Sequence, residues 1–128
     1  NFVKTMLRLS ETRDHLDIVA DQIGGPTPAA DIAATLLTCA QAMQGGHPGG
    51  TYHYSGTPAV SWADFAREIF RQANRATTVR DIPTSAYPTP AQRPLNSRLN
   101  CAKLATDFGI NQPAWQDGLA AVVKGLGS

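Results

Sequence analysis

The fold is decided by the stretch Leu16-Asp17-Ile18-Val19-Ala20-Asp21-Gln22-Ile23-Gly24-Gly25-Pro26-Thr27-Pro28. Its first part alternates in the way that is typical of a short strand. The turn Gly24-Gly25-Pro26 ends that strand. Thr27 then predicts a helix N-cap, with Pro28 at the first helical position. A strand, a tight turn and a helix in this order indicate an α/β fold.

Apolar periodicity and capping residues place further elements on both sides of this unit. Ser61 caps one helix, with Asp64 three residues later, and Gly109 stops another. The expected order is a helix at 1–12, the strand at 16–21, a helix at 28–43, a strand at 51–55, a helix at 62–70, an extended piece at 79–83, and helices at 101–108 and 115–126. We therefore expect an α/β protein with a few mainly parallel strands and a partial, three-layer-like arrangement of helices.

The composition indicates one globular piece. The chain has 128 residues, of which 42% are hydrophobic, and a net charge of +1. A core can form, and the charge creates no broad field that would attract nucleic acid or an anionic membrane. No apolar run reaches the length of a membrane span. Cys39 and Cys101 fall in predicted helices, which favours buried free thiols and a cytoplasmic protein, while a disulfide between them stays an open alternative.

The first candidate site is Arg93-Pro94-Leu95-Asn96-Ser97-Arg98-Leu99, which follows a Pro-rich loop. Two fixed cations beside an amide and a hydroxyl suit a ligand with phosphate and sugar oxygens. Pro94 biases Arg93 towards an extended conformation and so aims its side chain. The alternative is a surface loop that Arg93 braces through a salt bridge to a carboxylate such as Asp81 or Asp107.

The second candidate site is Asp21 with Gln22. Both residues follow the predicted strand, and open α/β sheets collect ligands at the carboxyl ends of their strands. The alternative is a plain connection from strand to helix, whose turn residues need no ligand.

Other chemistries find little support in the sequence. His15, His47 and His53 share no metal-ligand spacing with each other or with the cysteines, so we expect no metal. The sequence contains neither a Gly-x-Gly-x-x-Gly dinucleotide fingerprint nor a Gly-x-Ser-x-Gly nucleophile elbow. Trp62 and Trp115 lie on apolar stripes, and we expect both to pack in the core or at an interface.

Several segments occur in the order and spacing of one enzyme family. They are Asn1-Phe2-Val3-Lys4-Thr5-Met6, Val19-Ala20-Asp21-Gln22-x-Gly24-x-Pro26-Thr27, Gly50-Thr51-Tyr52-His53, Ser61-Trp62-x-x-Phe65-Ala66 and Arg93-Pro94-x-Asn96-Ser97. From Asn1 to about Leu126 the chain resembles the C-terminal part of the dTDP-4-dehydrorhamnose reductase family, a group of Rossmann-type extended short-chain dehydrogenases/reductases. The resemblance implies reduction of the C4 keto group of dTDP-4-dehydro-L-rhamnose by NADPH or NADH, giving dTDP-L-rhamnose for cell-surface polysaccharides.

The resemblance also implies what this piece lacks. In the family, the cofactor fingerprint, the catalytic Thr and the Tyr-x-x-x-Lys motif lie upstream of Asn1. None of Tyr52, Tyr54 and Tyr87 is followed by Lys at that spacing. We therefore expect residues 1–128 to be a single C-terminal, substrate-binding portion without the N-terminal dinucleotide-binding part, without bound cofactor and inactive alone. The chain begins within a helix, which indicates a piece of a longer protein.

By position, the resemblance implies a set of substrate-binding residues, which are Asn1, Phe2, Gln22, Arg93, Asn96 and Ser97. The expected partners are the dTDP-sugar and the missing Rossmann half, to whose sheet the strand at 51–55 would return. The strand edge and apolar helix faces left exposed favour self-association. Two alternatives stay open: a portion of another extended short-chain sugar-nucleotide epimerase or dehydratase, and a stand-alone, non-catalytic protein that binds a ligand or dimerises.

Overall fold

The computed structural model describes residues 1–127. In chain order the elements are α1 (Phe2–Leu9), β1 (His15–Val19), β2 (Ile23–Gly24), α2 (Ala29–Gln44), β3 (Val60–Ser61), α3 (Trp62–Gln72), β4 (Thr78–Ile82), the single-turn 3-10 helix η1 (Thr84–Ala86), α4 (Ala102–Phe108) and α5 (Trp115–Gly125). Helices alternate with short strands, so the expected α/β class is confirmed. The two-residue strands β2 and β3 are additions that the sequence pattern did not predict.

The longest strands form a parallel pair, as expected. β1 and β4 pair along their whole length, with Asp17 opposite Arg80. The Arg80 guanidinium donates to both carboxylate oxygens of Asp17, at 2.7 and 2.6 Å, and these hydrogen bonds lower the pKa of Asp17 below its ordinary value. β2 and β3 form a second, antiparallel pair.

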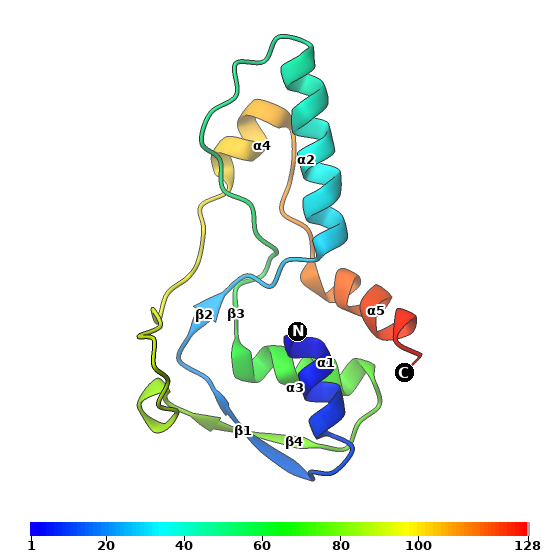
Figure 1. Cartoon of the computed structure of the whole chain (residues 1–128), viewed down its shortest axis with the longest axis vertical. Coiled ribbons are helices and arrows are strands. Elements are labelled where there is room, and N and C mark those ends of the chain that lie inside the picture. The colour runs from blue at the N-terminus through cyan, green and yellow to red at the C-terminus, as the bar shows by residue number, and fades with distance from the viewer. Residues whose placement is uncertain (128) are drawn as a thin grey trace.

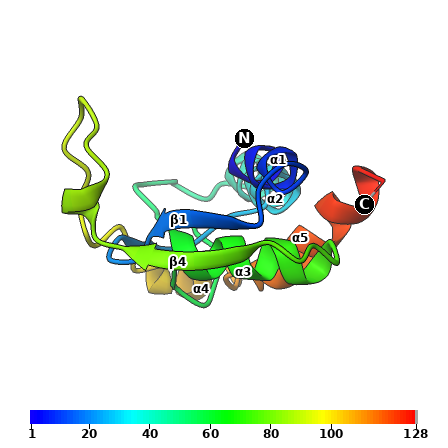
Figure 2. The same ribbon diagram turned by 90° about the horizontal axis from the view of Figure 1, so that it is seen from below.

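Three helices and the β1–β4 ribbon enclose the hydrophobic core, and we call this part the lower lobe. Figure 1 shows the ribbon along the bottom of the molecule with α1 and α3 above it, and Figure 2 shows α3 behind the ribbon when it is seen from below. α3 begins as expected, because the Ser61 hydroxyl accepts a hydrogen bond from the Asp64 amide at 3.0 Å. The core residues are Met6, Leu7, Leu16, Phe65, Ala66, Ile69, Phe70, Ala73, Trp115, Leu119 and Val123.

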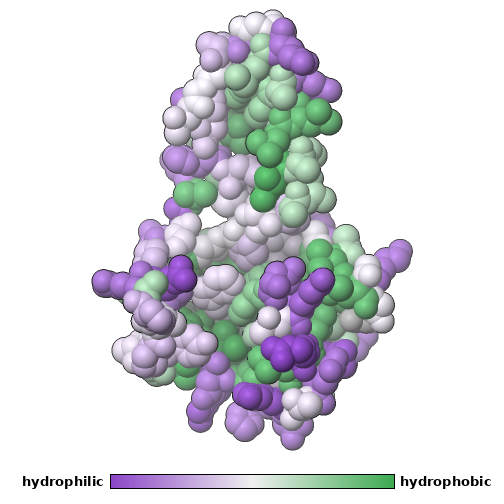
Figure 3. All heavy atoms as spheres, viewed as in Figure 1, coloured by the Kyte–Doolittle hydropathy of each residue, from purple (hydrophilic) through white to green (hydrophobic). Residues whose placement is uncertain are grey.

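α2 and α4, with residues 45–56 running along the side of α4 away from α2, project from this core as the upper lobe (Figure 1). α2 has the expected length and the expected apolar stripe, yet it buries no residue. The exposed fractions of Ile32, Leu36, Leu37 and Met43 are 39, 64, 61 and 53%. Figure 3 shows the apolar surface that gathers over this helix. Within residues 1–127, nothing covers that stripe.

The strand expected at 51–55 does not form within residues 1–127, and its expected return to the sheet of the missing half stays a prediction. These residues are extended but pair with no strand among the residues that the structure describes. Side chains of α4 hold them instead: the Tyr52 hydroxyl donates to Asp107 at 2.7 Å, and the Lys103 ammonium donates to the Thr51 carbonyl at 3.2 Å. A strand requires a neighbouring backbone ladder, and the described chain offers none here.

The expected capping role of Thr27 is wrong. The N-cap of α2 is Pro28, which makes no side-chain capping bond. The Thr27 hydroxyl instead donates to the Gly25 carbonyl at 2.9 Å and accepts from the Gly56 amide at 3.1 Å. Two backbone segments touch at this point, since a Cβ on Gly56 would overlap the Pro26 carbonyl oxygen. The hydrogen bond between Thr27 and the distant Gly56 is therefore formed in place of the N-cap that the sequence predicted.

Both cysteines are free thiols, so the disulfide alternative is not realised. Cys101 is buried, as expected, with its sulfur 3.6 Å from the Ser55 hydroxyl. Cys39 is only half-buried on α2. Among the described helices, none is both long enough and apolar enough to cross a membrane.

Candidate functional site

The two polar motifs that the sequence placed 70 residues apart lie side by side. Ile23 and Asn96 form a parallel bridge, in which the Ile23 amide donates to the Leu95 carbonyl at 2.9 Å and the Ser97 amide donates to the Ile23 carbonyl at 2.8 Å. Figure 1 shows the segment that leads from β4 to α4 passing beside β2. The second candidate site therefore joins the first, and Gln22, Asn96 and Ser97 belong to one region.

Gln22 is the centre of a chain of hydrogen bonds. Its side-chain carbonyl accepts from the Trp62 indole N–H at 3.3 Å, and its amide nitrogen donates to the Thr84 hydroxyl at 3.2 Å. The Thr84 hydroxyl donates in turn to Asp21 at 2.6 Å. The Thr84 backbone amide donates to the same carboxylate at 2.9 and 3.1 Å. These bonds from the Thr84 side chain and backbone lower the pKa of Asp21 and keep it ionised.

Phe2 and Trp62 add an aromatic surface to this region. Their ring centroids lie 4.8 Å apart, and Phe2 also stacks on Phe65 of the core at 5.5 Å. Trp115 is buried as expected, but Trp62 is 43% exposed. Trp62 therefore lies at the surface beside Gln22, whereas the sequence analysis expected it to pack in the core or at an interface. One feature of the sequence could have indicated this exposure: Trp62 directly follows the N-cap Ser61, and the first residue of a helix lies at the margin of the buried stripe.

Asn1 has a local structural task. Its side-chain carbonyl accepts from the Lys4 amide at 3.0 Å and caps α1. This cap fixes the start of the helix and places the next residue, Phe2, against Trp62. The amide group of Asn1 is exposed and makes no other side-chain hydrogen bond within residues 1–127.

The side chains of Asn96 and Ser97 differ in how many of their hydrogen-bonding groups are already used within the chain. The Asn96 side-chain carbonyl accepts from the backbone amide and the guanidinium of Arg98, at 3.1 and 3.3 Å, so it braces its own loop. Ser97 faces Gly24, where an added Cβ would lie 3.4 Å from the Ser97 Cβ. Its hydroxyl has no hydrogen-bond partner in the part of the chain that is described, and this leaves it available to a ligand.

Arg93 stands at the end of the exposed loop 84–93. This loop surrounds a hollow of about 340 Å³, lined at one end by Thr84 and at the other by Arg93. Thr84 also bonds to Gln22, so the hollow adjoins the hydrogen-bonded chain. The salt-bridge alternative for Arg93 finds no support among residues 1–127, because Arg67 pairs with Asp81 and Tyr52 donates to Asp107.

The connection from β1 to α2 does not fit a dinucleotide cofactor. A phosphate-cradling turn leaves open space at a helix N-terminus. Here a Cβ on Gly25 would overlap the Gly56 carbonyl oxygen, so the chain's own backbone fills the turn. The first turn of α2 also carries the acidic Asp31, which repels phosphate. Likewise, residues 1–127 contain no group of three or more side chains that could hold a metal ion.

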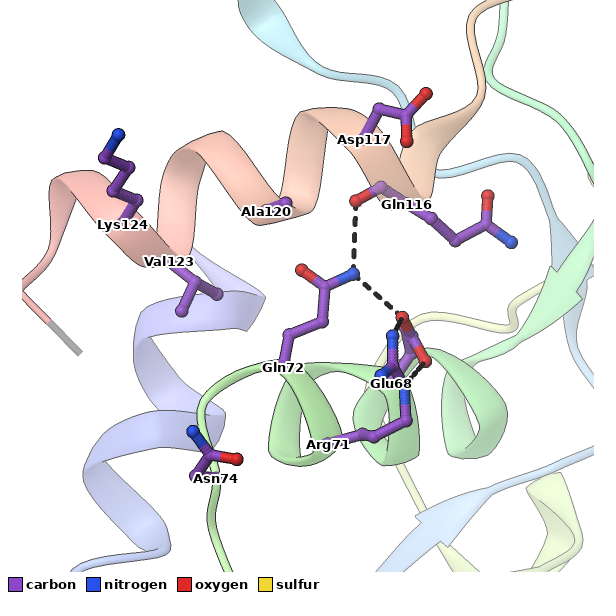
Figure 4. A pocket seen from close by; sticks show the side chains of 9 residues that line it. All are labelled: Glu68, Arg71, Gln72, Asn74, Gln116, Asp117, Ala120, Val123 and Lys124. Carbon is purple, nitrogen blue, oxygen red and sulfur yellow. Dashed lines mark hydrogen bonds and ion pairs between the residues drawn. The ribbon is translucent and has the colours of Figure 1, made fainter.

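A larger hollow, of about 700 Å³, lies between α3 and α5 (Figure 4). Its polar groups mostly satisfy one another. Gln72 donates to Glu68 at 2.8 Å and to the Gln116 carbonyl at 3.1 Å, and Arg71 pairs with Glu68 at 2.6 Å. The Arg71 bonds lower the pKa of Glu68. Arg71 neutralises Glu68 here, whereas Asp117 and Lys124 make no ion pair within residues 1–127 and the buried side-chain carbonyl of Gln72 has no hydrogen-bond partner there.

The comparisons with known proteins identify the family. The family model described as "RmlD substrate binding domain" matches residues 1–127. A dTDP-4-dehydrorhamnose reductase of Sinorhizobium fredii is 44% identical over 133 residues, a match that covers 98% of this chain and 45% of that protein. The chain thus spans less than half the length of such relatives.

Solved structures give the same result for the fold. A dTDP-4-dehydrorhamnose reductase from Clostridium acetobutylicum superimposes with a TM-score of 0.92 and 35% identity, over 100% of this chain and 44% of that one. The enzyme from Bacillus anthracis, solved in complex with NADP, has a TM-score of 0.80 and 38% identity, over 94% of this chain and 41% of that one. The resemblance inferred from the sequence motifs is confirmed. On its sequence and on its fold, the chain belongs to the RmlD substrate binding domain family.

Proposed function

We propose that this chain is the sugar-nucleotide-binding part of a dTDP-4-dehydrorhamnose reductase, and that it works with an N-terminal half that binds NADPH or NADH. The family match along residues 1–127 supports this. So does the share of the relatives that the chain covers, 45% and 44%, because it leaves room for another half. The relative from Bacillus anthracis binds NADP, whereas the β1–α2 turn of this chain is filled.

The proposed reaction reduces the C4 keto group of dTDP-4-dehydro-L-rhamnose to the alcohol of dTDP-L-rhamnose. The nicotinamide held by the other half supplies the hydride for C4, and an upstream acid supplies the proton for the oxygen. This chain contributes binding and orientation, which convert a bimolecular encounter into a positioned one. It carries no catalytic residue in this proposal, and the enzyme acts in the cytoplasm.

The observation that carries the proposal is the bridge between Ile23 and Asn96. It brings Gln22 next to Asn96 and Ser97, and we propose that these three residues bind the substrate together with Asn1, Phe2 and Arg93. Arg93 suits the charged diphosphate because its planar fork donates two parallel hydrogen bonds. Gln22 and Ser97 suit neutral sugar oxygens, and the half-buried Phe2 ring offers an apolar surface.

The N-terminal half also provides the cover that the upper lobe lacks. The apolar stripe of α2 is exposed, and residues 51–55 are extended without a partner strand. Both are expected of a chain whose neighbour supplies a sheet edge and an apolar face. Without that neighbour, these surfaces favour self-association.

The test compares three samples by their consumption of NADPH or NADH in the presence of dTDP-4-dehydro-L-rhamnose. They are this chain alone, the N-terminal half alone, and the two halves in one polypeptide. We expect turnover only from the joined protein. Turnover by this chain alone, or a joined protein that rejects the substrate while its nicotinamide site is filled, would overturn the proposal.

A further inference from the structure

The hydrogen bonds from Trp62 through Gln22 and Thr84 to Asp21 all donate in the same direction. If the proposed function holds, this direction gives Trp62 a role. We propose that Trp62 is a positioning residue. Its indole N–H holds the Gln22 carbonyl and thereby turns the Gln22 amide nitrogen so that one N–H points to an acceptor oxygen of the sugar nucleotide.

The direction follows from the chemistry of the two ends. An indole N–H can only donate, and a carboxylate can only accept. Asp21 therefore receives the Thr84 hydroxyl proton at 2.6 Å. With its proton used, the Thr84 oxygen accepts from the Gln22 amide nitrogen at 3.2 Å, and the Gln22 carbonyl faces Trp62 at 3.3 Å. The reverse orientation of the amide would set two donors against each other at Trp62.

The fixed orientation leaves one N–H of Gln22 unused. A primary amide carries two N–H donors, and Thr84 takes one of them. Diphosphates and sugars are rich in acceptor oxygens, so an oriented donor matches the proposed ligand. A Gln22 side chain without these two anchors would lose the orientation, because the two ends of an amide are nearly equal in shape.

Trp62 itself is held in place from two sides. Ser61 caps the helix that Trp62 opens, and the Phe2 ring packs against the indole at 4.8 Å. At 43% exposure the indole remains accessible. The pKa of Asp21 is lowered by its bonds from Thr84, so the far end of the chain stays an acceptor at neutral pH.

The experiment uses the joined enzyme. Trp62→Phe keeps an aromatic ring against Phe2 and removes the N–H donor together with the pyrrole ring. We expect the KM for dTDP-4-dehydro-L-rhamnose to rise about three- to tenfold, the range that one neutral hydrogen bond supplies, while kcat changes less than about twofold. The KM for NADPH should stay unchanged. Trp115→Phe is the matched control, because that indole also donates a hydrogen bond, to the Pro58 carbonyl at 2.8 Å, but it lies in the core.

A double-mutant cycle separates positioning from simple packing. In the Gln22→Leu background, Trp62→Phe should add almost nothing to the rise in KM, because the group that it positions is gone. A full additive effect, or an unchanged KM in Trp62→Phe with normal wild-type turnover, would overturn the positioning role alone. A wild-type joined enzyme that does not reduce the sugar nucleotide would overturn this role together with the proposed function.

A second measurement uses dTDP itself as the probe. In the Trp115→Phe protein, Trp62 is the remaining tryptophan of this chain. We expect dTDP to change its emission in the joined enzyme, and Gln22→Leu to weaken that response at least threefold. A tryptophan fluorescence that does not change at saturating dTDP would count against placing Trp62 beside the ligand.

Discussion

α3 and α2 both carry apolar residues at helical spacing, but those of α3 are confined to one face and become buried, whereas those of α2 are spread more widely around the helix and stay exposed. In α3 the stripe of Phe65, Ala66, Ile69 and Phe70 is buried in the lower lobe. In α2 the stripe of Ile32, Leu36 and Leu37 lies open to solvent. Both stripes predict a helix correctly, since 3.6-residue periodicity depends only on the chain itself. They do not tell which surface covers the helix. In α3 the chain supplies that surface, whereas within residues 1–127 no element covers the stripe of α2.

The same contrast holds for the arginines. Arg67 and Arg80 are tied to carboxylates, Asp81 and Asp17, at 2.6 Å each, so they serve the lower lobe. Arg93 has no such partner among the described residues. Arg93 shares this lack of an ion pair with Arg8, Arg13, Arg75 and Arg98, so its proposed role rests on its place next to Pro94 and the hollow of about 340 Å³.

The largest expected effect tests the contrast between the helices directly. Ile69 is fully buried, and Ile69→Ala should lower the free energy of unfolding by about 2–5 kcal/mol, because it removes contacts and leaves a cavity. Leu37→Ala, on the open stripe, should change it by less than about 0.5 kcal/mol in the isolated chain. Urea titrations of both variants measure the difference. Equal losses would mean that α2 is covered after all.

The second prediction concerns the joint between the lobes. Gly56→Ala introduces a Cβ that overlaps the Pro26 carbonyl oxygen, and we expect a loss of about 1–3 kcal/mol. Gly125→Ala is the matched control, since its Cβ meets nothing within 4 Å and should stabilise α5 by roughly 0.4–1 kcal/mol. Thermal melts of the two variants should shift in opposite directions. A tolerated Gly56→Ala would contradict the close backbone contact.

The third prediction tests the proposed role of Arg93. In the joined enzyme, Arg93→Ala should weaken sugar-nucleotide binding by about 1.5–3 kcal/mol, or ten- to a hundredfold, through loss of one charge-assisted contact. Arg93→Lys should recover only part, because an ammonium cannot reproduce the planar fork. Nicotinamide binding should hardly change. Calorimetric titration with dTDP measures the effect, and unchanged affinity would remove Arg93 from the site.

The fourth prediction asks whether the open stripe of α2 drives self-association. We expect the isolated chain to associate, and Leu36→Glu with Leu37→Glu to shift it towards the monomer, because the charges resist burial. Ala34→Glu with Thr38→Glu adds the same charge on another face of α2 and should leave association intact. Sedimentation velocity over a range of concentrations separates the two. A wild-type chain that is monomeric at every concentration would be a clear negative.

The smallest effect concerns the ion pair between Asp17 and Arg80 on the lower lobe. The folded-state pKa of Asp17 is lowered by Arg80, so its contribution to stability is present above the ordinary carboxyl pKa. It is lost as the pH falls through the lower, folded-state value. Unfolding titrations of wild type and Arg80→Gln should therefore converge at acid pH. Salt should also reduce the difference at neutral pH, because the pair is exposed.

The sequence by itself determined the elements whose signals are local. The Ser61 cap bonds to Asp64 as predicted, and Gly109 ends α4 in the left-handed region at φ 66°. The strands at β1 and β4 and the four longer helices also fall where periodicity placed them. Caps, turns and periodicity act over a few residues, so the chain near each signal suffices to fulfil it.

Only the tertiary structure decided the features that depend on distant partners. Thr27 does not cap α2, because its hydroxyl accepts a hydrogen bond from the backbone amide of Gly56, which is distant in the sequence. Residues 51–55 do not form a strand because no ladder faces them within residues 1–127. Trp62 lies partly exposed beside Gln22, which accepts its N–H, although its apolar stripe predicts packing in the core or at an interface. The physical reason is the same in each case: a hydrogen bond or an apolar contact needs a second group, and a linear sequence does not state which distant group that is.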